Sequence, residues 1–324
     1  MRKIFSTFFV LVMVLSIASC GTPVVPVNEI VNPSIGELVF KEDEELQEKL
    51  AALAPEAKGK LGVFALLMED ERSVSFNGSE HFAMQSVVKL PVSMLVMQQV
   101  AEGKFTLDQK VKFTTDDLVP SNMRSPLRDK NPKGGEVTVN ELIRLALVES
   151  DGSACDILTR IAGGTAAVQA FVRSIGISDM QMKRTHKEFR KSWDFQYENW
   201  ATPEGAAQLL TRLFPVQPTQ SDWQYNLDAT YDLIYQRMLE SIPGQNRLKA
   251  QLPPGTPIAH KTGTGGTKDG VTSATNDIGI ITLPSGKHVA IAVFVGDSSA
   301  DEKTRELVIA KVAKAVWDTW SGVK

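Results

Sequence analysis

The chain has 324 residues, 43% of them hydrophobic and 23% charged, which is enough to bury a full core in one large domain or two modest ones. Its net charge of −3 argues against a nucleic-acid surface, because such a surface needs a basic footprint. The 4 His and 2 Cys show no metal-ligand spacing, and no glycine-rich stretch ends as a phosphate loop does, so we expect neither a metal nor a cofactor.

The first twenty residues resemble a targeting segment. Two basic residues precede an apolar run, Ile4–Ile17, which is too short to span a bilayer and is followed by small residues up to Cys20. This order predicts a signal peptide over 1–20, and the cysteine after small residues resembles a lipobox, in which cleavage leaves Cys20 lipidated. We therefore expect a periplasmic protein that contacts the membrane only through this lipid.

The rest of the chain divides into a short tether and a folded domain. Residues 21–37 are rich in Pro and lack a helical period, which is typical of a tether, so we expect the domain over 38–324. In chain order, apolar periodicity and turn residues predict a helix over Glu45–Leu53, strands over Leu61–Met68 and Ser73–Asn77, helices over Ser86–Val100 and Val139–Ile161, a helix capped by Thr202, strands over Thr256–Thr262, Asn276–Leu283 and His288–Val295, and a closing helix over Asp301–Trp320.

Strands thus occur at both ends of the domain, and helices fill its middle. We expect the two ends, 38–85 and 232–324, to form one antiparallel sheet flanked by helices, which is an α/β sandwich. The middle, 86–231, should form an all-α subdomain. Cys155 is expected to be a lone buried thiol, and the tryptophans are expected to pack in the core or at an interface: Trp193, Trp200, Trp317 and Trp320.

Three short motifs follow one another along this layout. They are Ser86-Val87-Val88-Lys89 at a helix start, Ser150-Asp151-Gly152 in the helical middle, and Lys261-Thr262-Gly263-Thr264 at the end of a strand. Ser-x-x-Lys alone carries little weight, since a second copy occupies the last four residues of the chain. The order and wide spacing of all three motifs together indicate a catalytic site.

The residue types in these motifs suit acyl transfer. A serine hydroxyl needs a base, and Lys89 lies one helical turn from Ser86, so it can serve as that base if burial or a second cation lowers its pKa. Lys261 can be that cation and can attract a substrate carboxylate beside the two threonine hydroxyls of its motif, while Ser150 can relay a proton to a leaving amine. The backbone N–H groups of Ser86 and Thr264 are candidates for an oxyanion hole.

The motifs resemble those of the class A serine β-lactamases, within the penicillin-binding-protein superfamily. Residues outside the motifs extend the resemblance to a subgroup found in Bacteroidetes and among extended-spectrum enzymes, over residues 40 to 320: Phe82–Pro91, Ser125–Lys130, Gln196–Trp200 and Ala259–Val295. The resemblance implies a β-lactamase/transpeptidase-like fold, an α/β sandwich and an all-α lobe with the site between them. It also implies a monomer that hydrolyses β-lactams through an acyl-Ser86 intermediate and so confers antibiotic resistance.

The sequence departs from the family pattern at the site. Gly152 stands where the family has an Asn that contacts the substrate's acylamide, and Arg124 stands where an aromatic residue is usual. The loop that carries the family's deacylating Glu reads Arg184-Thr185-His186-Lys187-Glu188. An ungapped comparison places His186 at the Glu position and a two-residue shift places Glu188 there, so both stay open as the base.

This loop also separates the possible functions. Besides a β-lactamase, the motifs are compatible with a covalent β-lactam sink or sensor whose deacylation is impaired, and with a D-Ala-D-Ala peptidase. Turnover of a chromogenic cephalosporin many times, once or never distinguishes these functions.

Overall fold

The computed structural model describes residues 41–213 and 231–322. The predicted signal peptide, Cys20 and the tether lie outside the described residues. None of the helices described combines the length and apolarity that crossing a bilayer requires.

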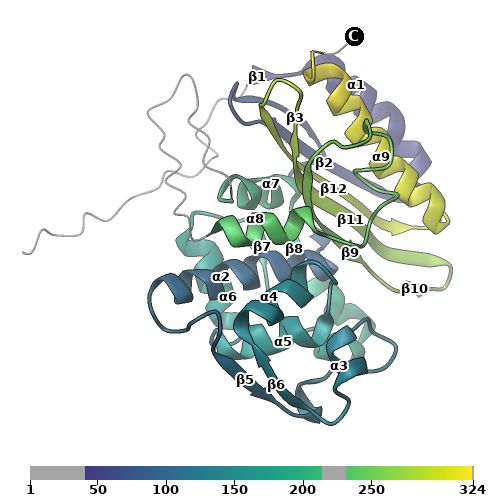
Figure 1. Ribbon diagram of the computed structural model, residues 1–324. Helices are drawn as coiled ribbons and strands as arrows, with labels where there is room; N and C mark the ends of the chain where they lie inside the picture. Colours follow the sequence, from purple (N-terminus) through teal and green to yellow (C-terminus); the bar gives the residue numbers. More distant parts are fainter. Residues whose placement is uncertain (1–40, 214–230, 323–324) are drawn as a thin grey trace, which may run out of the picture. The chain divides into compact units, whose positions relative to one another are not determined.

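A seven-stranded sheet is the largest sheet over the described residues (Figure 1). Its strand order is β1-β3-β2-β12-β11-β10, and β9 also pairs with β11. The strands are β1 (Lys41–Glu42), β2 (Lys60–Leu67), β3 (Arg72–Phe76), β9 (Ile258–Thr264), β10 (Thr267–Lys268), β11 (Val271–Thr282) and β12 (His288–Ser298). As predicted, the sheet is built from both ends of the domain, and its pairs are antiparallel except at one edge. There β1 runs parallel to β3, a pairing that the helix between β1 and the next strand permits.

The central strands of this sheet are buried on both faces, which explains why their sequences are continuously apolar. In β2, Val63 and Ala65 face one core and Phe64 and Leu66 face the other. The first core lies against α1 (Glu44–Leu53) and α9 (Glu302–Trp320), and the second lies against the helical region. Trp317 and Trp320 lie in the first core, as predicted, and Cys155 is a buried free thiol in the second.

The helical region occupies the middle of the chain. Its helices are α2 (Lys89–Ala101), α3 (Pro126–Lys130), α4 (Val139–Leu147), α5 (Gly152–Ile161), α6 (Thr165–Ser174), α7 (Pro203–Thr211) and α8 (Asp232–Leu239). It also contains short strands that were not predicted from the sequence: β4 (Phe82–Ala83), β5 (Lys110–Phe113), β6 (Gly135–Thr138), β7 (Met180–Gln181) and β8 (Trp200–Ala201). They pair as β4-β8-β7 and β5-β6, so the middle is predominantly but not wholly helical.

Two local features of this region position the site. Thr202 caps α7 by accepting a hydrogen bond from Gly205, as predicted. The single helical stretch predicted over Val139–Ile161 is wrong, because the chain breaks between α4 and α5. Ser150 there has φ of 56°, and the Asp151 side chain then caps α5 at Ala154. The break turns the Ser150 side chain out of the helical register toward the pocket.

Candidate active site

Ser86 lies in a 3₁₀ turn, Gln85–Val88, that leads directly into α2. Lys89, the first residue of α2, is 1% exposed, and its Nζ donates a hydrogen bond to Ser86 Oγ at 2.6 Å. Burial lowers the pKa of Lys89, since an ammonium group loses its hydration there. The spacing of three residues therefore brings this pair together, as the sequence indicates.

Lys89 also contacts the loop that holds both candidate deacylation bases, His186 and Glu188. Its Nζ lies 3.0 Å from Nε2 of His186, and Nδ1 of His186 lies 3.1 Å from Oδ1 of Asp156. His186 is 4% exposed. Burial is the main reason that the pKa of His186 is lowered, and the charge of Lys89 adds to the effect. The imidazole is therefore neutral at pH 7.

Glu188 is placed differently. Its Oε2 accepts hydrogen bonds from the backbone N–H of Thr185 at 2.9 Å and from the Thr185 hydroxyl at 3.3 Å, and its Oε1 lies 3.8 Å from Arg184. Glu188 does not line the pocket around Ser86, whereas His186 does. The structure thus brings only one of the two candidate bases to Ser86.

A second lysine joins the middle motif to the strand motif. Lys261 on β9 is fully buried, and its Nζ donates to Ser150 Oγ at 2.9 Å and to the Thr262 carbonyl at 3.0 Å. Burial and the charge of Lys89 hold the pKa of Lys261 well below its usual range. Lys261 lies behind the surface of the pocket, so its charge acts through Ser150 and Thr262.

The strand motif lies close to the turn that carries Ser86. A Cβ on Gly263 would come within 2.4 Å of the Met84 carbonyl oxygen, so glycine is required for this approach. Asn276 on β11 ties the two segments together, since its Nδ2 donates to the Ala83 carbonyl at 2.8 Å. Arg247, which is 4% exposed, donates to Thr264 Oγ1 at 2.8 Å and supplies a second buried cation at this end of the pocket.

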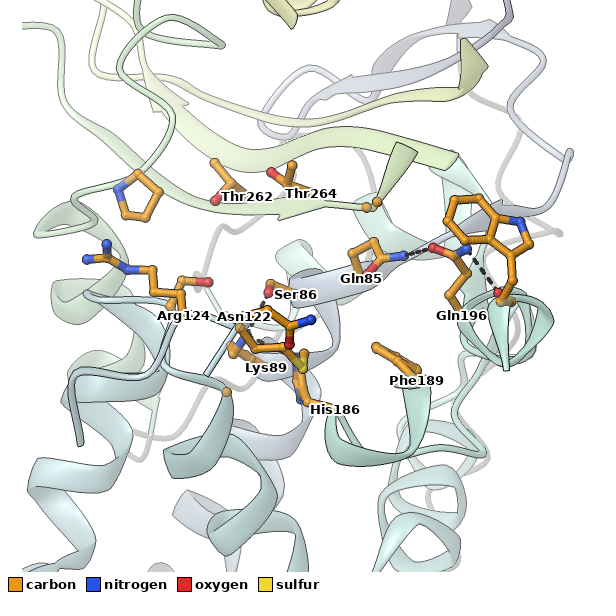
Figure 2. A pocket seen from close by; sticks show the side chains of 17 residues that line it. Gln85, Ser86, Lys89, Asn122, Arg124, His186, Phe189, Gln196, Thr262 and Thr264 are labelled. Atoms are coloured by element: carbon orange, nitrogen blue, oxygen red, sulfur yellow. Dashed lines mark hydrogen bonds between the residues drawn. The ribbon is translucent and has the colours of Figure 1, made fainter. Parts of the chain in front are cut away.

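Ser86, Lys89, Ser150 and His186 line one pocket of about 430 Å³ (Figure 2). Figure 2 shows Thr262 and Thr264 on the strand side and His186 with Phe189 on the loop side of Ser86. The lining comprises Gln85, Ser86, Lys89, Asn122, Met123, Arg124, Ser150, Gly152, His186, Phe189, Trp193, Gln196, Pro243, Thr262, Thr264, Gly265 and Gly266.

Several of these residues were not expected from the sequence. Trp193 was assigned to the core or an interface, but it lines the pocket beside Gly266, so that assignment is wrong. Gln85 donates to Gln196 at 2.8 Å, which joins the 3₁₀ turn to the loop. Gln85 directly precedes the Ser86 motif and Gln196 begins a stretch that carries the family resemblance, but no periodicity marks Trp193 on its irregular loop.

Local contacts also account for the two residues at the mouth of the pocket that differ from the family pattern, Gly152 and Arg124. Gly152 donates its N–H to the Arg124 carbonyl at 3.0 Å, and a Cβ there would meet Val119 at 3.3 Å. Arg124 is turned toward Glu149, to which its Nη2 donates at 3.2 Å. The floor at Gly152 is thus packed against the mouth loop.

One group of side chains carries atoms that can ligate metals. Atoms of Cys155, Asp156 and His186 lie within 4.8 Å of one another. However, both ring nitrogens of His186 have partners, both Asp156 oxygens accept backbone N–H groups, and burial raises the pKa of Cys155 to about 12. These engagements disfavour a metal centre at this group of side chains.

The fold and the Ser-Lys pocket define an active-site serine hydrolase of the penicillin-recognising type. The family model described as "Beta-lactamase enzyme family" matches residues 45–320. The chain is 34% identical to β-lactamase VEB-1 of Pseudomonas aeruginosa, over 85% of this chain and 90% of that protein. It is 37% identical to the extended-spectrum β-lactamase PER-1 of Pseudomonas aeruginosa, over 84% of this chain and 86% of that protein.

Solved structures agree. A β-lactamase from Chitinophaga pinensis superimposes with a TM-score of 0.78 at 37% identity, covering 85% of this chain and 99% of that one. The chain belongs to the β-lactamase enzyme family, as a class A serine β-lactamase. This confirms the resemblance and the fold that the sequence predicts.

Proposed function

We propose that the chain hydrolyses the amide bond of β-lactam antibiotics through an acyl intermediate on Ser86, with His186 as the base that activates the deacylating water. The observation that carries this proposal is the chain of contacts from Ser86 Oγ to Lys89 Nζ, 2.6 Å, and from Lys89 Nζ to His186 Nε2, 3.0 Å. Such hydrolysis destroys the antibiotic, so the cellular consequence is resistance.

Acylation uses the groups around Ser86. Lys89, whose pKa burial lowers, accepts the hydroxyl proton while Ser86 Oγ bonds to the lactam carbonyl carbon. The backbone N–H groups of Ser86 and Thr264 stabilise the oxyanion. When the C–N bond breaks, Ser150 gives its proton to the leaving nitrogen and receives in turn the proton that Lys89 took from Ser86. Lys261 Nζ, 2.9 Å away, holds Ser150 ready for this relay.

The substrate carboxylate belongs at the strand end of the pocket. Thr262 and Thr264 offer hydroxyl groups there, and two buried cations, Lys261 and Arg247, lie directly behind them. The fields of buried cations are weakly screened, so these two attract an anionic group without touching it. Gly263 allows the strand to approach the Ser86 turn closely enough for one substrate to reach both.

Deacylation needs a base that holds one water against the ester. Neutral His186 meets this requirement when Lys89 releases its hydrogen bond to Nε2, because the lone pair then accepts a water proton. The water oxygen bonds to the acyl carbon, the C–Oγ bond breaks, and the proton on Nε2 passes through Lys89 to Ser86 Oγ, which leaves His186 and Lys89 neutral again. Glu188 is held on Thr185 and Arg184 and takes no part.

Intact-mass time courses with a cephalosporin test the proposal. Ser86→Ala should form no adduct, and His186→Ala should form one that persists, because only deacylation loses its base. Glu188→Gln is the matched control and should turn over like the parent. A persistent adduct in Glu188→Gln together with normal turnover in His186→Ala would show that the base is Glu188.

The pH dependence gives an independent check. Since the pKa of His186 lies below its ordinary 6.5, His186 stays unprotonated at neutral pH, and deacylation should fall only as the pH drops below about 6.5. A parent protein that forms an adduct and never turns over would instead be a covalent sink. Turnover of D-Ala-D-Ala peptides in preference to cephalosporins would identify a peptidase.

The same proposal includes export and anchoring of a monomer. The apolar run before Cys20 and the small residues beside it support cleavage and lipidation at that cysteine. Metabolic labelling with a palmitate analogue should mark the parent protein in membranes, and Cys20→Ser should abolish the label. A parent protein without label, or a Cys20→Ser protein that keeps the label and stays in membranes, would contradict the anchor.

A further inference from the structure

Asp156, in the second turn of α5, is the partner of His186 on the side away from Ser86. Its Oδ1 accepts the backbone N–H of His186 at 2.8 Å and lies 3.1 Å from the ring Nδ1. Its Oδ2 accepts the backbone N–H of Lys187 at 2.9 Å. The Asp156 side chain is 10% exposed, so little water competes for these bonds.

These contacts assign the protons of the imidazole. An ionised carboxylate can only accept hydrogen bonds, so the hydrogen on the Asp156 side of the ring belongs to Nδ1. A neutral ring carries only one such hydrogen, so Nε2 has a lone pair and accepts a hydrogen bond from Lys89 Nζ. The ring is therefore the Nδ1–H tautomer, and its only basic nitrogen faces Ser86.

We propose that Asp156 is the positioning residue of deacylation: it holds His186 in the Nδ1–H tautomer and stabilises the imidazolium that forms when Nε2 takes the water proton. This inference rests on the proposed role of His186. The water O–H bond breaks, its proton goes to Nε2, and the water oxygen forms the bond to the acyl carbon. Asp156 keeps its charge throughout and exchanges no proton.

The charges around His186 explain why such a partner is required. Lys89 from α2 and Lys261 from β9 both disfavour a positive imidazole, and the Cys155 thiol on α5 stays neutral because burial raises its pKa to about 12. Asp156 is the group on these elements that favours the imidazolium. Without it, the ring would be a weaker base with no fixed tautomer.

Asp156→Asn is the first test. The amide keeps one oxygen for the loop backbone but loses the charge and can donate to the ring, which favours the wrong tautomer. We expect deacylation to slow by ~10²-fold, with acylation nearly unchanged and the acidic limb of deacylation moved to lower pH. Asp108→Asn, an exposed carboxylate on the loop after α2, is the control and should behave like the parent.

The same Asp156 substitution, made in a protein that also carries His186→Glu, separates positioning of the imidazole from simple support of the loop. In His186→Glu the base carries its own negative charge, so the Asp156 carboxylate becomes a like-charged neighbour. Asp156→Asn should then leave deacylation unchanged or make it faster, the opposite of its effect beside His186. An equal loss in both backgrounds, or an unmoved acidic limb in the single variant, would overturn the inference and show that Asp156 only holds the loop.

The outcomes also distinguish this inference from the proposal on which it rests. If His186→Ala traps the adduct and Asp156→Asn deacylates normally, His186 remains the base and the positioning role fails. If His186→Ala turns over normally, the base itself is wrong. Melting temperatures of all variants check folding. The ¹⁵N shifts of the His186 ring in substrate-free protein report the tautomer directly, without any need for turnover.

Discussion

Two walls of the pocket are held in place by different means. On one wall, seven residue pairs join β9 to β11, and Asn276 ties this ladder to the turn that carries Ser86. On the other wall, residues 183–198 form a loop that contains two short 3₁₀ turns, and side chains bind several of its backbone N–H groups. Asn199 accepts the N–H groups of Lys183 and Arg184, and Asp156 accepts those of His186, the proposed base, and Lys187.

The difference assigns the two half-reactions to unequal supports. Among the proposed acylation groups, Lys89 begins α2, and Lys261 and Thr264 lie on β9, where many backbone hydrogen bonds hold each position. The proposed deacylation base lies on a loop that a few polar side chains hold. Substitutions in the strand wall should therefore impair acylation, and substitutions in the loop wall should impair deacylation, in both cases by amounts that can be measured separately.

The largest effect is expected on the strand wall, at Lys261. Lys261→Ala leaves Ser150 without its partner and removes a buried charge behind the carboxylate site, so acylation should slow by ~10²–10⁴-fold and KM should rise. Pre-steady-state acylation rates check this, with Lys287→Ala at the far end of the sheet as the control. If an esterified, uncharged substrate suffers no loss, Lys261 serves only carboxylate binding. Negligible effects on both substrates would remove it from the site.

On the loop wall, Asn199 should matter next. It is fully buried, accepts two backbone N–H groups at 2.8 and 2.9 Å and donates to the Arg184 carbonyl at 2.8 Å. Asn199→Ala leaves these groups unsatisfied and should cost ~3 kcal/mol of unfolding free energy, with deacylation slowed more than acylation. Urea unfolding and adduct lifetimes measure both. Asn131→Ala, on an exposed helix end, should change neither; equal slowing of both half-reactions would break the assignment.

Gly263→Ala tests the close approach within the strand wall. The added Cβ would lie 2.4 Å from the Met84 carbonyl oxygen, which is backbone, so β9 or the Ser86 turn must shift. We expect a loss of ~1–3 kcal/mol in stability and slower acylation. Gly135→Ala, whose Cβ would make an ordinary 3.6 Å contact, is the control. An unaltered acylation rate would mean that the two segments need not touch.

The smallest effect is expected at the mouth. The Arg124–Glu149 pair is solvent-exposed on the arginine side, at 54%, so Arg124→Ala should change stability by less than ~1 kcal/mol. Thermal unfolding measures this. A larger loss would show that the mouth loop supports Gly152, whose N–H binds the Arg124 carbonyl, through the side chain as well as the backbone.

The sequence by itself determined the elements and the pairs that are local. Continuous apolar runs marked β2 and β12, because strands buried on both faces need no alternation, and helical spacing placed Lys89 against Ser86. The order of the three motifs was sufficient to predict the family, and in the structure each motif lies where a helix or strand begins or ends.

Only the tertiary structure decided the contacts between distant segments. Lys261 meets Ser150 across 111 residues, and His186 meets Lys89 across 97, distances over which no local spacing fixes a geometry. The choice between His186 and Glu188 was undecidable in the sequence because two neighbouring positions on an irregular loop share no periodicity. In the structure, the Asp156 carboxylate on α5 binds the backbone at His186 and Lys187, and His186 lines the pocket with Ser86. Glu188 is held on Thr185 and does not line it, which supports the proposal of His186 as the base.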